Sequence, residues 1–144
     1  MAEQTSASIV IEAPAQQVME TIAAVEDYPT WVGAVTSVEV LERDADQRAL
    51  SARFVMDAGP VKDTYVLVYD WAGDGLSVSW RLTEGQIQKA QAGSYRLRET
   101  ADGTEVTYEL TVDLTIPMIG MLKRKAEKVI INTALGELKK RVEG

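Results

Sequence analysis

The sequence predicts an α+β fold in which a curved antiparallel sheet is closed over by one long C-terminal helix. Two observations carry this prediction. From Glu105 to Thr115 apolar and polar residues alternate strictly, which is typical of a strand with one buried and one solvent-facing side. After Pro117 apolar residues recur at steps of three and four, which indicates an amphipathic helix, and a proline is tolerated in its first turn.

The chain before this sheet predicts one strand and two short helices. Ala7, Ile9 and Ile11 alternate with polar neighbours and indicate the first strand. Pro14 suits the first turn of a helix that the segment 26–29 ends, because the residue before a proline disfavours helical angles. Residues 30–32 are expected to form a second helical turn that stops near Gly33.

Six further strands are predicted in succession, joined by turns, which is typical of an antiparallel meander. Turn residues stand at 44–46, 59–60, 73–75 and 102–103, and Gly93 indicates a bend or a bulge within the fifth of these strands. The predicted ranges are about Thr36–Arg43, Leu50–Ala58, Val61–Trp71, Leu76–Thr83, Gln86–Glu99 and Glu105–Thr115. The buried face of the final helix is expected to comprise Leu122, Ala126, Val129, Ile130, Thr133, Ala134, Leu138 and Val142.

Length and composition exclude several function classes. The 144 residues predict a single domain over 1–144, and no apolar run approaches the ~20 residues that cross a bilayer. Residues 1–8 lack the pattern of a signal peptide, so we expect a cytoplasmic protein. Without cysteine or histidine there are no disulfides, no thiolate or imidazole zinc sites and no serine–histidine catalysis. No calcium loop, phosphate-binding loop or dinucleotide motif occurs, so we expect neither metal nor cofactor.

The net charge of −7 is unevenly distributed. Residues 116–144 carry three acidic side chains against seven basic ones, Lys123, Arg124, Lys125, Lys128, Lys139, Lys140 and Arg141, a net charge of +4. The remaining chain, with eight basic and nineteen acidic residues, carries −11, which argues against nucleic acid as a partner. The basic helix is either an ordinary solvated face or a contact surface for anionic lipid or an acidic carrier protein.

Two sequence motifs resemble a known family. Residues 27–32 (DYPTWV), followed by 38–42 (VEVLE), are similar to the D-Y-P-x-W/F … V-x-V-L-E signature of the START-like superfamily. This superfamily, also called SRPBCC, includes the polyketide cyclase/dehydrase family and the coenzyme-Q-binding proteins. Residues 111–117 and 122–127 resemble actinobacterial members labelled cyclase/dehydrase, so that the resemblance spans nearly the whole chain.

The resemblance implies the helix-grip fold, a seven-stranded antiparallel sheet curled around the C-terminal helix, with two small helices after the first strand. It also implies an apolar cavity between sheet and helix that holds lipids, sterols, quinones or polyketides. Candidate walls of that cavity are Trp31, Phe54, Met56, Tyr65, Leu67, Tyr69, Trp80, Tyr95, Tyr108, Leu110, Met118, Met121, Leu122, Val129 and Thr133. The composition includes one phenylalanine but five tyrosines and three tryptophans. It favours an interior that contains hydroxyl and indole N–H groups over a uniformly apolar core.

Three functions follow from these observations. The first is carriage or sequestration of a hydrophobic small molecule without catalysis. The second is a polyketide aromatase/cyclase in the same cavity, for which Asp63, Tyr65 and Tyr69 are the candidate catalytic residues because they share strand parity. The third is an interaction module with a filled interior that uses the basic C-terminal helix as its contact surface.

Overall fold

The computed structural model describes residues 5–58, 61–115 and 120–144 of the chain. Within these ranges seven strands form one antiparallel sheet in the order β1-β7-β6-β5-β4-β3-β2. The predicted fold class is confirmed. The strands are β1 (Thr5–Ile11), β2 (Val35–Arg43), β3 (Ala49–Ala58), β4 (Val61–Trp71), β5 (Ser77–Glu84), β6 (Gln88–Thr100) and β7 (Gly103–Leu114), and the helices are α1 (Ala15–Ala23), the 3₁₀ helix η1 (Val25–Thr30) and α2 (Gly120–Glu143).

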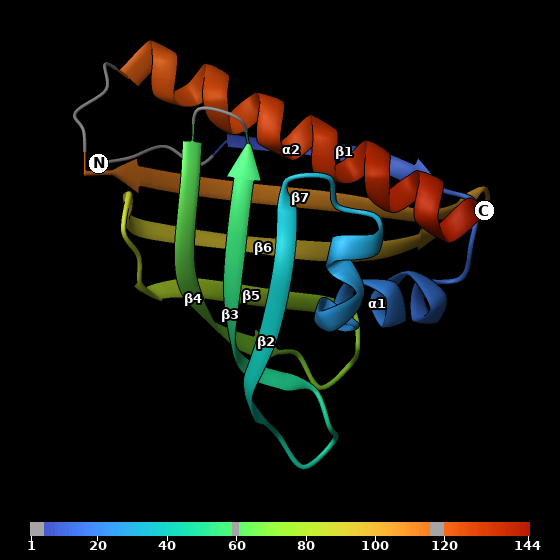
Figure 1. Ribbon diagram of the computed structural model, residues 1–144. Coiled ribbons are helices and arrows are strands. Elements are labelled where there is room, and N and C mark those ends of the chain that lie inside the picture. Colours follow the sequence, from blue (N-terminus) through green and yellow to red (C-terminus); the bar gives the residue numbers. More distant parts are fainter. Residues whose placement is uncertain (1–4, 59–60, 116–119) are drawn as a thin grey trace.

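The sheet is strongly bent, as the alternating apolar faces predict. Figure 1 shows β2, β3 and β4 crossing in front of β5, β6 and β7, so that the two halves of the sheet face each other across the interior. The helix α2 packs along β1 and β7 and contacts α1, while η1 packs on β2. The interior is thus bounded by the concave sheet, by α2 on one side and by α1 and η1 at one end.

The two small helices are present, but the second begins earlier than the sequence suggests. The helix α1 ends at Ala23, and the following η1 includes Tyr28 and Pro29, which were expected to end a helix rather than to form one. A 3₁₀ turn accommodates this segment because its hydrogen bonds close over three residues. Trp31 N donates to Tyr28 O, for example, so the missing N–H of Pro29 breaks no α-helical ladder.

Gly93 is not a bulge. It lies opposite Trp80 within an uninterrupted stretch of the β5–β6 pairing, and the irregularity in β6 falls between Gln88 and Ala90. The reason for a glycine is space, because a Cβ atom at position 93 would lie 2.6 Å from Cζ2 of the Trp80 ring. Gly93 therefore provides the flat surface on which the Trp80 indole lies.

The long C-terminal helix is confirmed, but its predicted buried face is only partly correct. Leu138 and Val142 are buried, whereas Ala126, Val129, Ile130 and Thr133 are exposed. The buried stripe is Glu127, Ile131, Leu135, Leu138 and Val142, at steps of three and four. Pro117 and Met118 lie outside the described residues, as do the side chains of Met121 and Leu122.

Glu127 decides which side of α2 faces the sheet. Its carboxylate accepts a hydrogen bond from Thr5 Oγ1 of β1 at 2.8 Å and from the backbone N of Val112 in β7 at 2.7 Å. At the other end of α2, Lys139 donates to the carbonyl of Val10, and the Glu143 carboxylate accepts from the backbone N of Glu12. These polar contacts fix the rotation of the helix, which apolar periodicity leaves ambiguous.

Candidate functional site

A row of aromatic side chains crosses the concave face of the sheet. Alternation along each strand places these side chains on the same side, and the strand register brings Phe54 beside Tyr65, Tyr69 beside Trp80, and Tyr95 beside Tyr108. The Tyr95 and Tyr108 ring centroids are 4.6 Å apart, and Phe54 stacks on Tyr65 at 5.4 Å. Trp80 links Tyr69 on β4 to Tyr108 on β7, because its ring centroid lies 6.1 Å from that of Tyr69 and 5.7 Å from that of Tyr108.

The end of η1 extends this aromatic row. Tyr28 packs against Phe54 at 6.2 Å and against Trp31 at 5.1 Å, the latter in an edge-on arrangement. The Tyr28 hydroxyl donates a 2.5 Å hydrogen bond to the carbonyl of Ile22 in α1. Tyr28 was absent from the predicted set of cavity residues, although it stands in the D-Y-P motif that carried the family resemblance.

Four of the five tyrosine hydroxyls are accessible to solvent. Those of Tyr65, Tyr69, Tyr95 and Tyr108 take part in no hydrogen bond among the described residues. In the same part of the chain, no fully buried side-chain nitrogen or oxygen lacks a partner, so these hydroxyls are not fully buried. Their residues retain 7–9% exposure, whereas the neighbouring core residue Leu110 retains 1%. The hydroxyl ends of the aromatic row are therefore reached by solvent, whereas most of each ring is buried.

Burial keeps these phenols neutral. Loss of hydration raises the pKa of Tyr65, and the nearby carboxylate of Asp63 raises it further. Burial also raises the pKa of Tyr69, Tyr95 and Tyr108 well above the ordinary value, and each of these groups is close enough to other phenols to add to the effect. At neutral pH the site therefore presents O–H groups that donate hydrogen bonds rather than phenolate bases.

Asp63 holds the β5–β6 connection. Its carboxylate is buried and accepts hydrogen bonds from the backbone N atoms of Gln86, Ile87 and Gln88, at 2.9, 3.3 and 3.1 Å. The side-chain amide of Gln88 donates to the same carboxylate at 3.3 Å. These donors account for the burial of an acidic group in the interior, since a buried charge requires such partners.

A directional chain of hydrogen bonds links this carboxylate to the aromatic row. Trp80 Nε1 donates to Gln91 Oε1 at 3.0 Å, and Gln91 Nε2 donates to Gln88 Oε1 at 2.5 Å. The amide of Gln88 then donates to Asp63. The indole N–H of Trp80 and the amides of Gln88 and Gln91 therefore have hydrogen-bond partners within the protein, in contrast to the four tyrosine hydroxyls.

One carboxylate of α2 also approaches the aromatic row. Glu137 accepts a hydrogen bond from the backbone N of Gly33 at 3.0 Å and lies near enough to Tyr95 to raise the pKa of its hydroxyl. Glu137 thereby connects the helix to the loop after η1. It was not among the predicted site residues, because a single half-buried acid on a helix has no distinguishing pattern in sequence.

The structure brings together most of the predicted wall residues and separates a few. Leu67 and Leu110 are buried beside the aromatic row, and Met56 and Trp31 are half-buried. Val129 and Thr133 are exposed on α2, and Met118 with the side chains of Met121 and Leu122 lies outside the described residues. Trp71, which was not predicted, stacks on Tyr69 at 5.4 Å and donates to the carbonyl of Ala49 at 2.7 Å.

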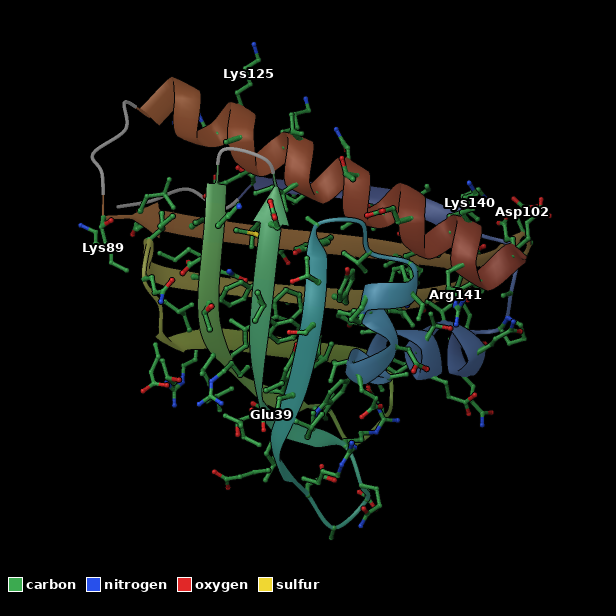
Figure 2. All side chains as sticks on the ribbon, viewed as in Figure 1. Glu39, Lys89, Asp102, Lys125, Lys140 and Arg141 are labelled. Carbon is green, nitrogen blue, oxygen red and sulfur yellow. The ribbon has the colours of Figure 1, made fainter. Side chains whose placement is uncertain are left out.

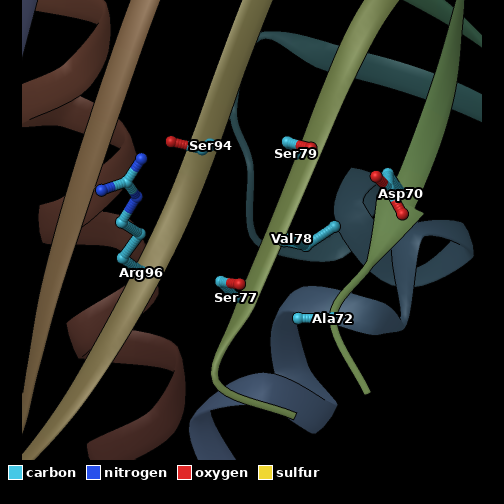
Figure 3. A pocket seen from close by; sticks show the side chains of 7 residues that line it. All are labelled: Asp70, Ala72, Ser77, Val78, Ser79, Ser94 and Arg96. Atoms are coloured by element: carbon cyan, nitrogen blue, oxygen red, sulfur yellow. The ribbon is translucent and has the colours of Figure 1, made fainter. Parts of the chain in front are cut away.

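The opposite, convex face carries a shallow polar hollow of about 190 Å³. Figure 3 shows Ser77, Ser79 and Ser94 between Asp70 and Arg96, with Val78 and Ala72 completing the lining. Its charged members are solvent-exposed, and Arg96 is paired with Glu109 at 3.5 Å. Among the described residues no group of three or more acidic side chains is arranged to hold a metal ion. The concave face is thus the better candidate for a ligand site.

Comparison with known proteins identifies the family of this chain. Residues 11–139 match the model of the family described as polyketide cyclase/dehydrase and lipid transport. The chain belongs to this family. The family is one of START-like proteins that bind hydrophobic small molecules. No curated protein matches the sequence of this family member.

Solved structures show the same fold. A START superfamily protein of Mycobacterium smegmatis superposes with a TM-score of 0.90 at 18% identity, covering 97% of each chain. A protein of Thermus thermophilus has a TM-score of 0.80 at 26% identity, again with 97% of each chain covered. The Zhui aromatase/cyclase of a Streptomyces species has a TM-score of 0.76 at 16% identity, over 98% of this chain and 93% of that one.

Proposed function

We propose that this protein binds a hydrophobic small molecule between the concave face of its sheet and α2, and carries or sequesters it. The supporting observation is the group of four phenol hydroxyls that border accessible space without a partner among the described residues. In a permanently filled core these hydroxyls would be unfavourable, because phenylalanine occupies nearly the same volume without an unpaired donor. A ligand would supply the missing acceptors.

The chemistry of the lining defines the class of ligand. The rings of Phe54, Trp80 and their neighbours offer apolar contact area, and the neutral phenols offer O–H donors. A matching molecule has an apolar frame and carbonyl or hydroxyl oxygens, as in an oxygenated lipid, a quinone or a polyketide. Carriage requires only that the molecule be held and released, so it needs no reactive group beyond these donors.

Native mass spectrometry of the purified protein, followed by solvent extraction, tests this proposal. We expect a co-purifying apolar mass, or a rise in melting temperature with members of a hydrophobic ligand panel. Finding neither would refute carriage and would favour the third function, an interaction module with a filled interior.

Matched variants of β6 test the site itself. Tyr95→Phe removes one hydroxyl and retains the ring, so affinity for an oxygenated ligand should fall about 2- to 10-fold, the worth of one hydrogen bond. Ser94→Ala is the control, because Ser94 immediately precedes Tyr95 on the same strand and lies on the convex face. Equal affinities for the two variants would place the ligand elsewhere.

A polyketide aromatase/cyclase is the second candidate, and the proximity of Asp63 to Tyr65 favours it. Acid–base chemistry would then use the Tyr65 hydroxyl as a donor to a substrate carbonyl and Asp63 as the accompanying carboxylate. Tyr65→Phe should abolish turnover of a poly-β-ketone and lower its affinity by no more than about 10-fold. Asp63→Asn should abolish turnover as well, and circular dichroism must show that this variant is folded, because Asp63 also accepts the hydrogen bonds that hold the β5–β6 connection. If the wild-type protein turns over no such substrate, the cyclase assignment is wrong.

A further inference from the structure

The outward side of the first half of α2 exposes large apolar side chains. Val129 and Ile130 are 59% and 47% exposed, more than any other large hydrophobic residue in the described ranges. Val129 lies two residues after the buried Glu127 and two before the buried Ile131, and helical geometry therefore directs it away from the sheet. Nothing in the described parts of the fold covers this side.

Three cations lie on the same segment of α2. Arg124, Lys125 and Lys128 are all exposed, and within the described residues no ion pair joins any of them to an acid. Figure 2 shows Lys125 projecting away from the sheet. Glu127 is the single acidic residue between 124 and 136, and its carboxylate is turned inward onto β1 and β7. The exposed surface of this segment is consequently both apolar and positively charged.

We propose that this patch, formed by Arg124, Lys125, Lys128, Val129 and Ile130, docks on the surface of an anionic lipid bilayer. Exposed apolar side chains flanked by cations are the pattern of helices that lie in the membrane interface. Their cations meet lipid phosphates and their apolar side chains enter the boundary with the acyl chains. We choose the bilayer over an acidic protein partner because headgroups and acyl chains receive cations and isolated apolar side chains together without a shaped binding pocket.

The charge of the rest of the chain supports one orientation. Residues 1–115 carry −11 and are repelled by an anionic surface, whereas residues 116–144 carry +4. The described part of the chain contains no helix long and apolar enough to cross a membrane, so the proposed contact is peripheral. This docking goes beyond the proposed ligand carriage and does not depend on it.

Sedimentation with lipid vesicles tests the proposal. Ligand-free protein is mixed with vesicles of phosphatidylcholine alone, or of phosphatidylcholine and phosphatidylglycerol in a three-to-one ratio. We expect binding to the anionic vesicles only, weakened when salt is raised from ~0.1 M to ~0.5 M. Each cation near such a surface contributes about fivefold in affinity, so the triple variant Arg124→Gln, Lys125→Gln, Lys128→Gln should lose about 100-fold.

Two further variants separate the apolar contribution from simple attraction. The double variant Val129→Ser, Ile130→Ser should weaken vesicle binding at least tenfold, since both side chains lose their apolar contact with the membrane. Matched controls are Lys89→Gln, an exposed cation on β6, and Leu50→Ser, which is 37% exposed on β3. Both controls should bind as the wild type does.

The outcomes are decisive in either direction. Salt-sensitive binding that is lost in both helix variants and retained in both controls supports the proposal, provided that circular dichroism shows all variants folded. No binding to anionic vesicles, or equal binding by the helix variants and the wild type, overturns it. Capture of an acidic carrier protein that depends on the same cations, with no vesicle binding, would assign the patch to a protein partner and also overturn it. Because no ligand is used, failure here leaves the carriage hypothesis untouched.

Discussion

Raising the pH above 10 is expected to unfold this protein through its tyrosines. All five phenols of the chain have pKa values raised by burial, and the hydrogen bond that Tyr28 donates to Ile22 O further favours its neutral form. In the unfolded chain the same groups ionise near pH 10. Above that value the unfolded state therefore holds fewer protons than the folded state, and stability falls as the pH rises.

The size of the effect follows from the number of phenols. A group that is neutral when folded and ionised when unfolded costs about 1.4 kcal/mol for each pH unit above its unfolded pKa. With all five tyrosines behaving alike, the free energy of unfolding should fall by about 7 kcal/mol near pH 11. That loss equals most or all of the stability of a typical domain, so unfolding is expected between about pH 10 and pH 11.5.

Two signals recorded together test this prediction. Absorbance near 295 nm reports phenolate formation, and circular dichroism reports the sheet. We expect both to change in one cooperative step, and Tyr95→Phe to reduce the steepness of that step by about one proton. Gradual ionisation near pH 10 with the sheet intact would show that the phenols are solvated as in water, and would refute the argument from burial.

Three substitutions and one control, Gly73→Ala, test individual contacts of the fold. Gly93→Ala should destabilise the fold by about 1–3 kcal/mol because its Cβ collides with Trp80, whereas Gly73→Ala, whose Cβ meets nothing within 4 Å, should change stability by less than about 0.5 kcal/mol. Chemical denaturation measures both, and equal values would contradict the close contact. Gly136→Ala should stabilise α2 by up to about 1 kcal/mol, since that helical position is open and exposed; a destabilised variant would point to an unseen contact. Glu127→Gln should cost about 1–3 kcal/mol through loss of its charged hydrogen bonds to β1 and β7, and an unchanged melting temperature would show that this anchor is dispensable.

Much of the fold could be predicted because it depends on local pattern. Alternation from Glu105 to Thr115 and the sharp turns between strands determine which residues pair and which face is apolar. The aromatic row could be predicted for the same reason, since parity along each strand places Tyr65, Tyr69, Trp80, Tyr95 and Tyr108 on one side. Tyr28 was missed because its neighbourhood was interpreted as the end of a helix, where parity gives no direction.

The rotation of α2 could not be predicted from periodicity. The helix carries two apolar stripes, one through Ala126, Ile130 and Thr133 and the other through Ile131, Leu135 and Leu138, and both have the spacing of a buried face. A charged residue selects between them. Glu127 belongs to the second stripe and is buried only because β1 and β7 present donors at that point, which no property of the helix sequence reveals.

The sequence by itself determined the order of the elements, the dry face of each strand and the uneven charge of the chain, because these depend on residues close together along it. Tertiary structure alone decided which groups meet across long separations: Asp63 with the β5–β6 connection, Glu137 with Gly33, and Gly93 with the Trp80 ring. It also decided that four phenol hydroxyls are solvent-accessible without a partner among the described residues, while Val129 and Ile130 face outward. The physical reason is that hydrogen bonds and steric contacts join residues far apart in the chain, whereas hydrophobic periodicity reports only on residues that are close together in it.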